Sequence, residues 1–174
     1  MILLALGTNL GDRQANLESA LAALTGEGIS LRQVSSVYET AALLPEGAPA
    51  EWDIAYYNIV CVVETSHTPQ DLLLLVKALE QKLGRKDIGR WGPRLIDIDI
   101  LAHGDAVLDE ETLVLPHPAM LERDFVMLPL AEVAPHWHHP LAEKTAHEAV
   151  QQAGMRVGLG VMRLPLALRW EVGK

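Results

Sequence analysis

Apolar runs alternate with amphipathic segments along the first part of the chain, and this pattern predicts strands and helices in turn. Strands are predicted at 2–6, 29–38 and 56–64, where aliphatic and β-branched residues are frequent. A helix is predicted between the first two strands, because apolar residues recur there at every third or fourth position. Those residues are Leu17, Ala20, Leu21 and Leu24. Gly26 and Gly28 follow them and indicate where the helix ends.

A second helix is predicted to begin at Thr68-Pro69, since Thr can cap a helix and Pro suits its first position. Its buried stripe comprises Leu72, Leu75, Val76, Leu79 and Leu83. Gly84 is predicted to end it. Glu80 is not part of the stripe, so periodicity alone makes it a solvated surface acid.

Acids and aliphatic residues alternate over 96–100, which predicts a further strand. The order up to this point is strand, helix, strand, strand, helix, strand. That is the order of a ferredoxin-like βαββαβ core, an α+β fold in which helices pack on the faces of an antiparallel sheet. This fold hosts many functions and does not select one.

The remainder of the chain gives weaker patterns. A long loop is predicted to run to about Asp53, and 113–115 is expected to form a short strand. Helices are predicted at 125–133, with an interruption near Pro129, and at 142–153. No element is predicted after Gly154.

Composition places the chain among globular proteins, with 174 residues, 49% of them hydrophobic and 21% charged. The net charge of −9 disfavours binding to nucleic acid or to an anionic membrane. The apolar start at 2–6 is too short for a signal peptide, and no run has the roughly 18 apolar residues of a membrane span. The single Cys61 fits a reducing compartment. We therefore expect a cytoplasmic protein.

The strand at 96–100 carries the first candidate chemistry. Asp97 and Asp99 project from the same face, because successive side chains of a strand point to opposite sides. Such a carboxylate pair can hold Mg²⁺ together with phosphate oxygens, and Arg90 and Arg94 lie just before it. The alternative is a strand with one solvated face and no function. The basic loop at 85–94 favours a small anionic ligand.

Several motifs together resemble the 6-hydroxymethyl-7,8-dihydropterin pyrophosphokinases of folate biosynthesis. The motifs are Gly7-Thr8-Asn9-Leu10-Gly11-Asp12, Gly84-Arg85, Arg90-Trp91-Gly92-Pro93-Arg94, Asp97-Ile98-Asp99 and Pro116-His117. The resemblance implies transfer of pyrophosphate from ATP to the pterin hydroxymethyl group, with release of AMP. It covers about 1–135, so we expect a single domain over 1–174 with a tail of unassigned role from about 136.

The resemblance also implies roles for individual residues. The implied catalytic residues are Arg85, Arg94, Asp97 and Asp99, and the two aspartates would bind two Mg²⁺ ions. Residues implied to line the ATP site are Glu80, Trp91, Arg94, His117 and Arg123. Residues implied to bind the pterin are Thr40, Tyr56, Asn58, Trp91 and Phe125. The only partners implied are these two small substrates, and we expect a monomer.

The chain departs from the family pattern after Thr40, where Ala41-Ala42-Leu43-Leu44 replaces the usual Pro and Gly. Asp87 stands where relatives often carry a second Arg, and Thr112 stands where some relatives carry Arg. Two rival functions are considered: a two-metal nucleotidyltransferase or phosphohydrolase, and a ferredoxin-like binding module without catalysis. The acidic charge, and the lack of interleaved aromatic and basic residues on a strand, count against an RNA-binding module.

Overall fold

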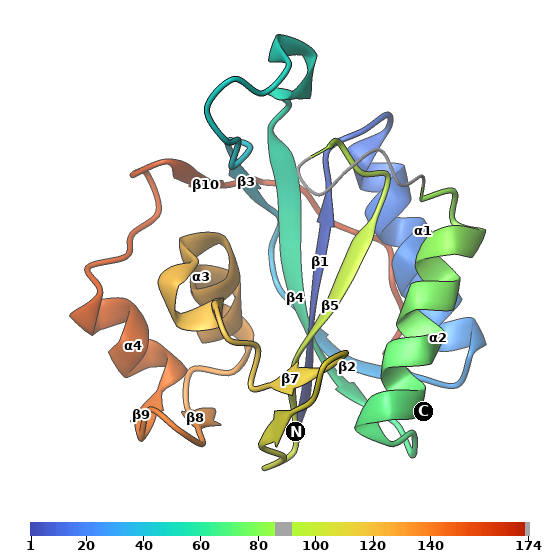
Figure 1. Ribbon diagram of the computed structural model, residues 1–174, viewed down its shortest axis with the longest axis vertical. Coiled ribbons are helices and arrows are strands. Elements are labelled where there is room, and N and C mark those ends of the chain that lie inside the picture. The colour runs from blue at the N-terminus through green and yellow to red at the C-terminus, as the bar shows by residue number, and fades with distance from the viewer. Residues whose placement is uncertain (86–91, 173–174) are drawn as a thin grey trace.

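The structure is a computed structural model that describes residues 1–85 and 92–172 (Figure 1). Its strands are β1 (Ile2–Thr8), β2 (Ser30–Val34), β3 (Tyr38–Thr40), β4 (Tyr56–Glu64), β5 (Asp97–His103), β6 (Leu108–Asp109), β7 (Val114–Leu115), β8 (His138–His139), β9 (Lys144–Thr145) and β10 (Val161–Arg163). Its α-helices are α1 (Arg13–Gly26), α2 (Pro69–Lys82), α3 (Asp124–Val133) and α4 (Ala146–Gln152). Two 3₁₀ turns, η1 (Ala50–Trp52) and η2 (Met120–Glu122), lie between them.

The main sheet is antiparallel, with β1 between β4 and β5. Its strands follow the order β10-β3-β4-β1-β5, and β2 also pairs with β4. The last, first, third and second strands of the βαββαβ unit therefore lie side by side in that order. This arrangement confirms the predicted α+β fold, and it leaves β5 at one edge of the sheet.

Helices cover both faces of the sheet (Figure 1). Helices α1 and α2 pack on one face, where Leu4, Leu6, Ile98 and Ile100 of the strands join one buried apolar cluster. Helix α3 packs on the other face over a second cluster, and α4 packs against α3. The alternation along β5 sends Ile98 and Ile100 into the first cluster, so Asp97 and Asp99 face the side on which α3 lies.

Polar side chains set where the helices begin. Asp12 accepts a hydrogen bond from the Ala15 N–H at 3.0 Å at the start of α1. Thr68 caps α2 as predicted, accepting from the Asp71 N–H at 3.2 Å, and Pro69 occupies the first turn. Thr145 and Glu148 form a reciprocal capping box at α4.

Three predictions about these elements are wrong. The strand predicted at 29–38 is divided into β2 and β3, because Ser35 turns to exchange two 3.0 Å hydrogen bonds with the backbone of Val60. Helix α3 continues through Pro129, which is one of the buried residues of that helix. The last helix begins at Ala146 rather than 142, because the Thr145 capping box fixes its start.

The tail beyond Gly154 also contains an element that its sequence pattern does not predict. Strand β10 pairs with β3, with Val161 opposite Thr40. Beyond it, Leu164, Leu166, Leu168 and Trp170 pack against the first apolar cluster. In the described part of the chain, no helix is long and apolar enough to cross a membrane.

Candidate active site

The candidate site lies at the start of the edge strand β5. Asp97 and Asp99 both line a cavity of about 290 Å³ on the α3 side of the sheet. Between them, the backbone of Ile98 points outward from the edge, where no further strand among the described residues covers it. Unpaired backbone groups in such a place require partners.

Two side chains of α2 supply those partners. Glu80 accepts a hydrogen bond from the Ile98 N–H at 2.6 Å, and Lys77 donates to the Ile98 carbonyl at 3.2 Å. Glu80 is only 1% exposed, so its predicted place as a solvated surface acid is wrong. It is buried because it completes the edge of β5. Lys77, which sequence reasoning missed, lies one helical turn before Glu80 and bonds to it at 2.9 Å.

Arg85 links Glu80 to the acid pair. Its guanidinium donates to the Glu80 carboxylate and, at 2.7 Å, to Asp97. Burial raises the pKa of Glu80, and the Lys77 ammonium and the Ile98 N–H offset part of that rise. Burial acts to lower the pKa of Arg85, but Asp97 and Glu80 outweigh it and raise the pKa overall. Arg85 therefore carries a positive charge between two carboxylates.

The surroundings of Asp99 disfavour its ionised form. Burial raises the pKa of its carboxyl, and the nearby charge of Asp97 raises it further. Lys77 lies 3.9 Å from Asp99, and Arg94 lies 3.7 Å from Asp97. Two carboxylates on one wall, with the ionised form of one disfavoured, match the oxygen ligands and the charge that a divalent cation requires. Among the described residues, no third His, Cys, Asp or Glu joins them as a metal-ligand group.

Asn9 holds the backbone of Arg94, a residue that lines the cavity. The side-chain oxygen of Asn9 accepts a hydrogen bond from the Arg94 N–H at 2.7 Å, and the backbone N–H of Asn9 donates to the Arg94 carbonyl at 3.0 Å. The Asn9 amide group also donates to the Ile54 carbonyl at 3.1 Å. Asn9 belongs to the Gly7 to Asp12 motif, but its role could not be predicted because its contacts are 45 and 85 residues away along the chain.

Gly84, which follows α2, lies close to Leu95, which precedes β5. Gly84 ends α2 with φ +97°, a conformation that favours glycine, and a Cβ there would lie 3.3 Å from Leu95 Cδ1. A larger residue at 84 would thus strain the backbone and displace the segment just before β5.

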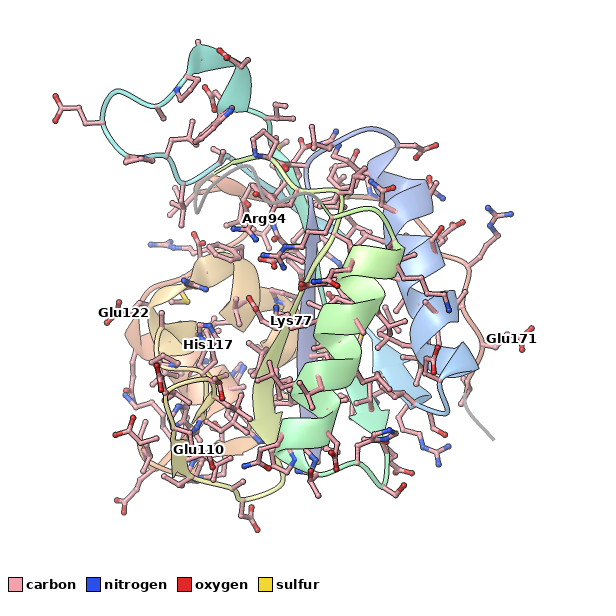
Figure 2. The ribbon with its side chains drawn as sticks, turned by 45° about the vertical axis from the view of Figure 1, so that its right-hand side comes forward. Lys77, Arg94, Glu110, His117, Glu122 and Glu171 are labelled. Atoms are coloured by element: carbon pink, nitrogen blue, oxygen red, sulfur yellow. The ribbon has the colours of Figure 1, made fainter. Side chains whose placement is uncertain are left out.

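His117 and Arg123 line the same cavity from the segment between β7 and α3. Figure 2 labels Arg94, Lys77 and His117, which approach β5 from a loop, from α2 and from that segment. Burial and the charge of Arg123 lower the pKa of His117, so its ring is neutral at neutral pH. The Ala119 N–H donates to His117 Nδ1 at 3.3 Å, which assigns the ring proton to Nε2 as a donor.

The rest of the cavity wall is aromatic and amide in character. Tyr56 and Asn58 come from β4, and Phe125 comes from α3. The Asn58 amide donates to Thr40 Oγ1 at 3.0 Å, which fixes its orientation. A Cβ at Gly7 would lie 3.3 Å from Asn58 Oδ1, so glycine allows this close approach. Arg123 lies 5.8 Å from the Phe125 ring centroid, within cation–π range.

The structure thus brings most of the candidate residues around one cavity. Those that line it are Thr40, Tyr56, Asn58, Arg94, Asp97, Asp99, His117, Arg123 and Phe125. Arg85 and Glu80 do not line the cavity: Arg85 donates a hydrogen bond to the cavity residue Asp97, and Glu80 accepts one from the Ile98 N–H of β5. Trp91 and Asp87 lie outside the described residues, so their predicted positions stay predictions.

Comparison with known proteins gives one consistent result. The family model described as 7,8-dihydro-6-hydroxymethylpterin-pyrophosphokinase matches residues 3–135. A 2-amino-4-hydroxy-6-hydroxymethyldihydropteridine pyrophosphokinase of Aquifex aeolicus is 39% identical over 147 residues, which cover 84% of this chain and 88% of the relative. A Synechocystis protein of the same name is 38% identical over 148 residues, 84% of this chain and 73% of the relative.

Longer relatives contain a second part that this chain does not match. The folate synthesis bifunctional protein of Chlamydia muridarum is 40% identical over 137 residues, so the match spans 78% of this chain but 30% of the relative. Among solved structures, a Plasmodium falciparum HPPK-DHPS chain superposes with a TM-score of 0.67 at 17% identity, covering 93% of this chain and 47% of that one. That likeness supports the fold. From the family match and the pyrophosphokinase relatives, this chain belongs to the 7,8-dihydro-6-hydroxymethylpterin-pyrophosphokinase family.

Proposed function

We propose that this protein transfers the pyrophosphoryl group of ATP to the hydroxymethyl group of 6-hydroxymethyl-7,8-dihydropterin and releases AMP. The observation that carries the proposal is the composition of one cavity. Among the described residues, an acid pair and two arginines share it with a tyrosine, a phenylalanine and a fixed amide. Such a site combines groups for polyphosphate with groups for a flat heteroaromatic ring.

The pterin is proposed to contact Tyr56, Phe125 and Asn58. Aromatic side chains gain from offset contact with a flat ring, and both line the cavity. The Asn58 amide is held by Thr40, so its oxygen is oriented to accept a hydrogen bond from an N–H on the pterin edge. These contacts would fix the ring and present its hydroxymethyl group toward the acid pair.

In the proposed reaction, the hydroxymethyl oxygen forms a bond to the β-phosphorus of ATP. The bond from that phosphorus to the oxygen bridging the α-phosphate breaks, AMP leaves with the electron pair, and the hydroxyl proton passes to solvent. Arg94 and Arg123 line the cavity, and their guanidinium groups would stabilise charge on the transferred phosphates. His117 would donate a hydrogen bond from its Nε2–H to a phosphate oxygen.

We further propose that Asp97 and Asp99 hold Mg²⁺, with two ions expected. When bound, the metal would neutralise phosphate charge and orient the polyphosphate. The raised pKa of Asp99 supports this assignment, because a cation would relieve the repulsion that disfavours its ionised form. Arg85 and Lys77 would keep the two carboxylates in place from the side of α2.

We also propose that the protein works as a monomer in the cytoplasm on these two small substrates. The buried, unpaired Cys61 is compatible with a reducing compartment. Sedimentation equilibrium with and without the substrates tests the monomer, and a concentration-dependent mass twice that of the chain would contradict it.

The activity is tested by incubating the protein with ATP, Mg²⁺ and the hydroxymethyl-dihydropterin. We expect AMP to form only when the pterin is present, in a one-to-one ratio with pterin diphosphate. Release of ADP, or of pyrophosphate without pterin, would instead indicate a phosphohydrolase or nucleotidyltransferase and overturn the proposal. Asp97→Asn is the matched inactive control, because it keeps the size of the side chain while removing its charge.

A further inference from the structure

The tail of the chain lies outside the family match, which ends at residue 135, yet it contributes to the main sheet. Strand β10 pairs antiparallel with β3, with Val161, Met162 and Arg163 opposite Thr40, Glu39 and Tyr38. Val161 is 1% exposed, so the pair is packed as well as hydrogen-bonded. In Figure 1, β10 runs beside β3 at the side of the sheet away from β5.

Strand β3 depends on this support because it is only three residues long. So short a strand is weakly held when it pairs on one side alone. Its last residue, Thr40, is the one that fixes the Asn58 amide, and Ala41 to Leu43 continue along the cavity wall. The tail strand therefore lies directly behind one wall of the proposed pterin site.

A carboxylate joins this wall to the opposite one. Glu132 lies on α3, the helix that carries Phe125 near its start. It accepts hydrogen bonds from the Tyr38 hydroxyl at 2.7 Å and from the Ser36 N–H and hydroxyl at 3.0 and 2.9 Å. Arg163 of β10 donates to Ser36 Oγ at 2.9 Å and lies 3.3 Å from Glu132.

The charges in this group favour an ionised Glu132. Burial acts to raise its pKa, but the hydrogen bonds from Tyr38 and Ser36 outweigh burial and lower the pKa overall. Burial and the Glu132 carboxylate raise the pKa of Tyr38, so its hydroxyl stays protonated as a donor. Glu132 is a charged acceptor, and its donors come from β3, from Ser36 two residues before β3 and from β10. It therefore holds these segments at a fixed separation.

The tail also faces the cavity wall across a second, open hollow of about 680 Å³. The wall contributes Thr40 to Leu43, and α3 and the residues before it contribute Arg123 and Phe125. The tail contributes Met155, Arg156, Leu159 and Gly160. A movement of the tail would thus change its contacts with both segments that flank the proposed pterin slot, the one at Thr40 to Leu43 and the one at Arg123 to Phe125.

We propose that β10 is a positioning element that acts through Arg163 and Glu132. It sets the width of the pterin slot between the wall formed by Thr40 to Leu43 and the wall formed by Phe125. Neither Arg163 nor Glu132 lines the cavity, so both act through β3 and α3 rather than on the substrate. The inference rests on the proposed function, because it takes the pterin to bind between those walls. It predicts a defect in pterin binding alone, with the phosphate side of the site unaffected.

The test compares Glu132→Gln and Arg163→Gln with a matched control, Arg169→Gln. Arg169 also belongs to the tail and also pairs with a glutamate, Glu18 of α1, at 2.6 Å, but that pair lies on the other side of the molecule's sheet from α3. Steady-state AMP release gives KM for pterin, KM for ATP and kcat for each variant. Thermal unfolding gives the stability of each variant separately.

Glu132→Gln is expected to raise KM for pterin about tenfold and Arg163→Gln about threefold, the scale of one charged hydrogen bond lost in a half-buried and a more exposed position. KM for ATP and kcat should stay within about twofold of wild type, and Arg169→Gln should change none of the three. Equal changes in both KM values, no change in either variant, or an equal effect of Arg169→Gln would overturn the inference. The Arg163 side chain is 54% exposed, so this variant carries the test if Glu132→Gln does not fold.

Direct titration of the pterin by calorimetry separates this inference from the proposed function. A wild-type protein that binds the pterin but releases no AMP refutes the proposed activity, while the comparison of pterin affinities among the variants still decides the role of β10. A wild-type protein that binds no pterin overturns both.

Discussion

Two substitutions of similar size test the acceptor that Glu80 offers to the Ile98 N–H and to Lys77. In Glu80→Gln the amide oxygen can still accept from the Ile98 N–H and from Lys77, which share Oε1. The amide nitrogen would face the Arg85 guanidinium, which bonds to Oε2 in the wild type, so two donors would meet. Arg85 keeps its bond to Asp97 and is partly exposed, so we expect a loss of about 1–2 kcal/mol in the free energy of unfolding.

Glu80→Met fills nearly the same volume but has no strong acceptor. The Ile98 N–H would then be buried at the edge of β5 without a partner, which costs about 1–3 kcal/mol beyond the loss in Glu80→Gln. Denaturation in urea gives both free energies by linear extrapolation. Glu64→Gln is the matched control, since Glu64 pairs with Arg32 on the surface, and its transition midpoint should not change.

Equal stabilities for Glu80→Gln and Glu80→Met would refute the reasoning, because they would show that the Ile98 N–H does not depend on Glu80. Pterin-dependent AMP release measured on the same variants adds a functional readout. If Glu80 holds the strand segment between Asp97 and Asp99, Glu80→Met should lower kcat more than Glu80→Gln does.

Three further outcomes are expected. Phe125→Ala should weaken pterin binding about tenfold in calorimetry and leave nucleotide binding unchanged, because it removes one aromatic face of the slot. Cys61 should not react with a thiol reagent at mildly alkaline pH until the protein unfolds, since burial raises the pKa of its thiol; rapid labelling of folded protein would contradict this. The His117 ring should titrate below its ordinary pKa of 6.5 in NMR spectra. Protonation of the ring then costs more in the folded than in the unfolded state, so the contribution of His117 to stability is present above pH 6.5 and is lost as the pH falls below it. An NMR titration midpoint at or above 6.5 would contradict this prediction.

The local features of the fold follow from the sequence because they depend on neighbouring residues. Alternation along β5 places Asp97 and Asp99 on one face whatever the rest of the chain does. Thr68 and Pro69 start α2 by contacts within one helical turn. The element order then leaves few topologies, of which the antiparallel ferredoxin-like sheet is one.

The errors that bear on the site concern residues whose environment is set by distant parts of the chain. Periodicity describes which face of α2 meets the core, but Glu80 is buried because an edge strand 18 residues later needs an acceptor. Strand β10 has no alternating pattern long enough to predict it, and it forms by pairing with β3 about 120 residues earlier in the chain. Asn9 and Lys77 likewise gain their roles only when β5 and the segment before it are in place.

The central claim, that this cavity transfers the two outer phosphates of ATP as one group, is tested most directly with ATP labelled differently at the α- and γ-phosphates. After reaction with Mg²⁺ and the hydroxymethyl-dihydropterin, the products are separated and each label is counted. We expect the γ label in the pterin product and the α label in AMP, with neither transferred in Asp97→Asn. An α label on the pterin, or a γ label released as orthophosphate, would contradict the account.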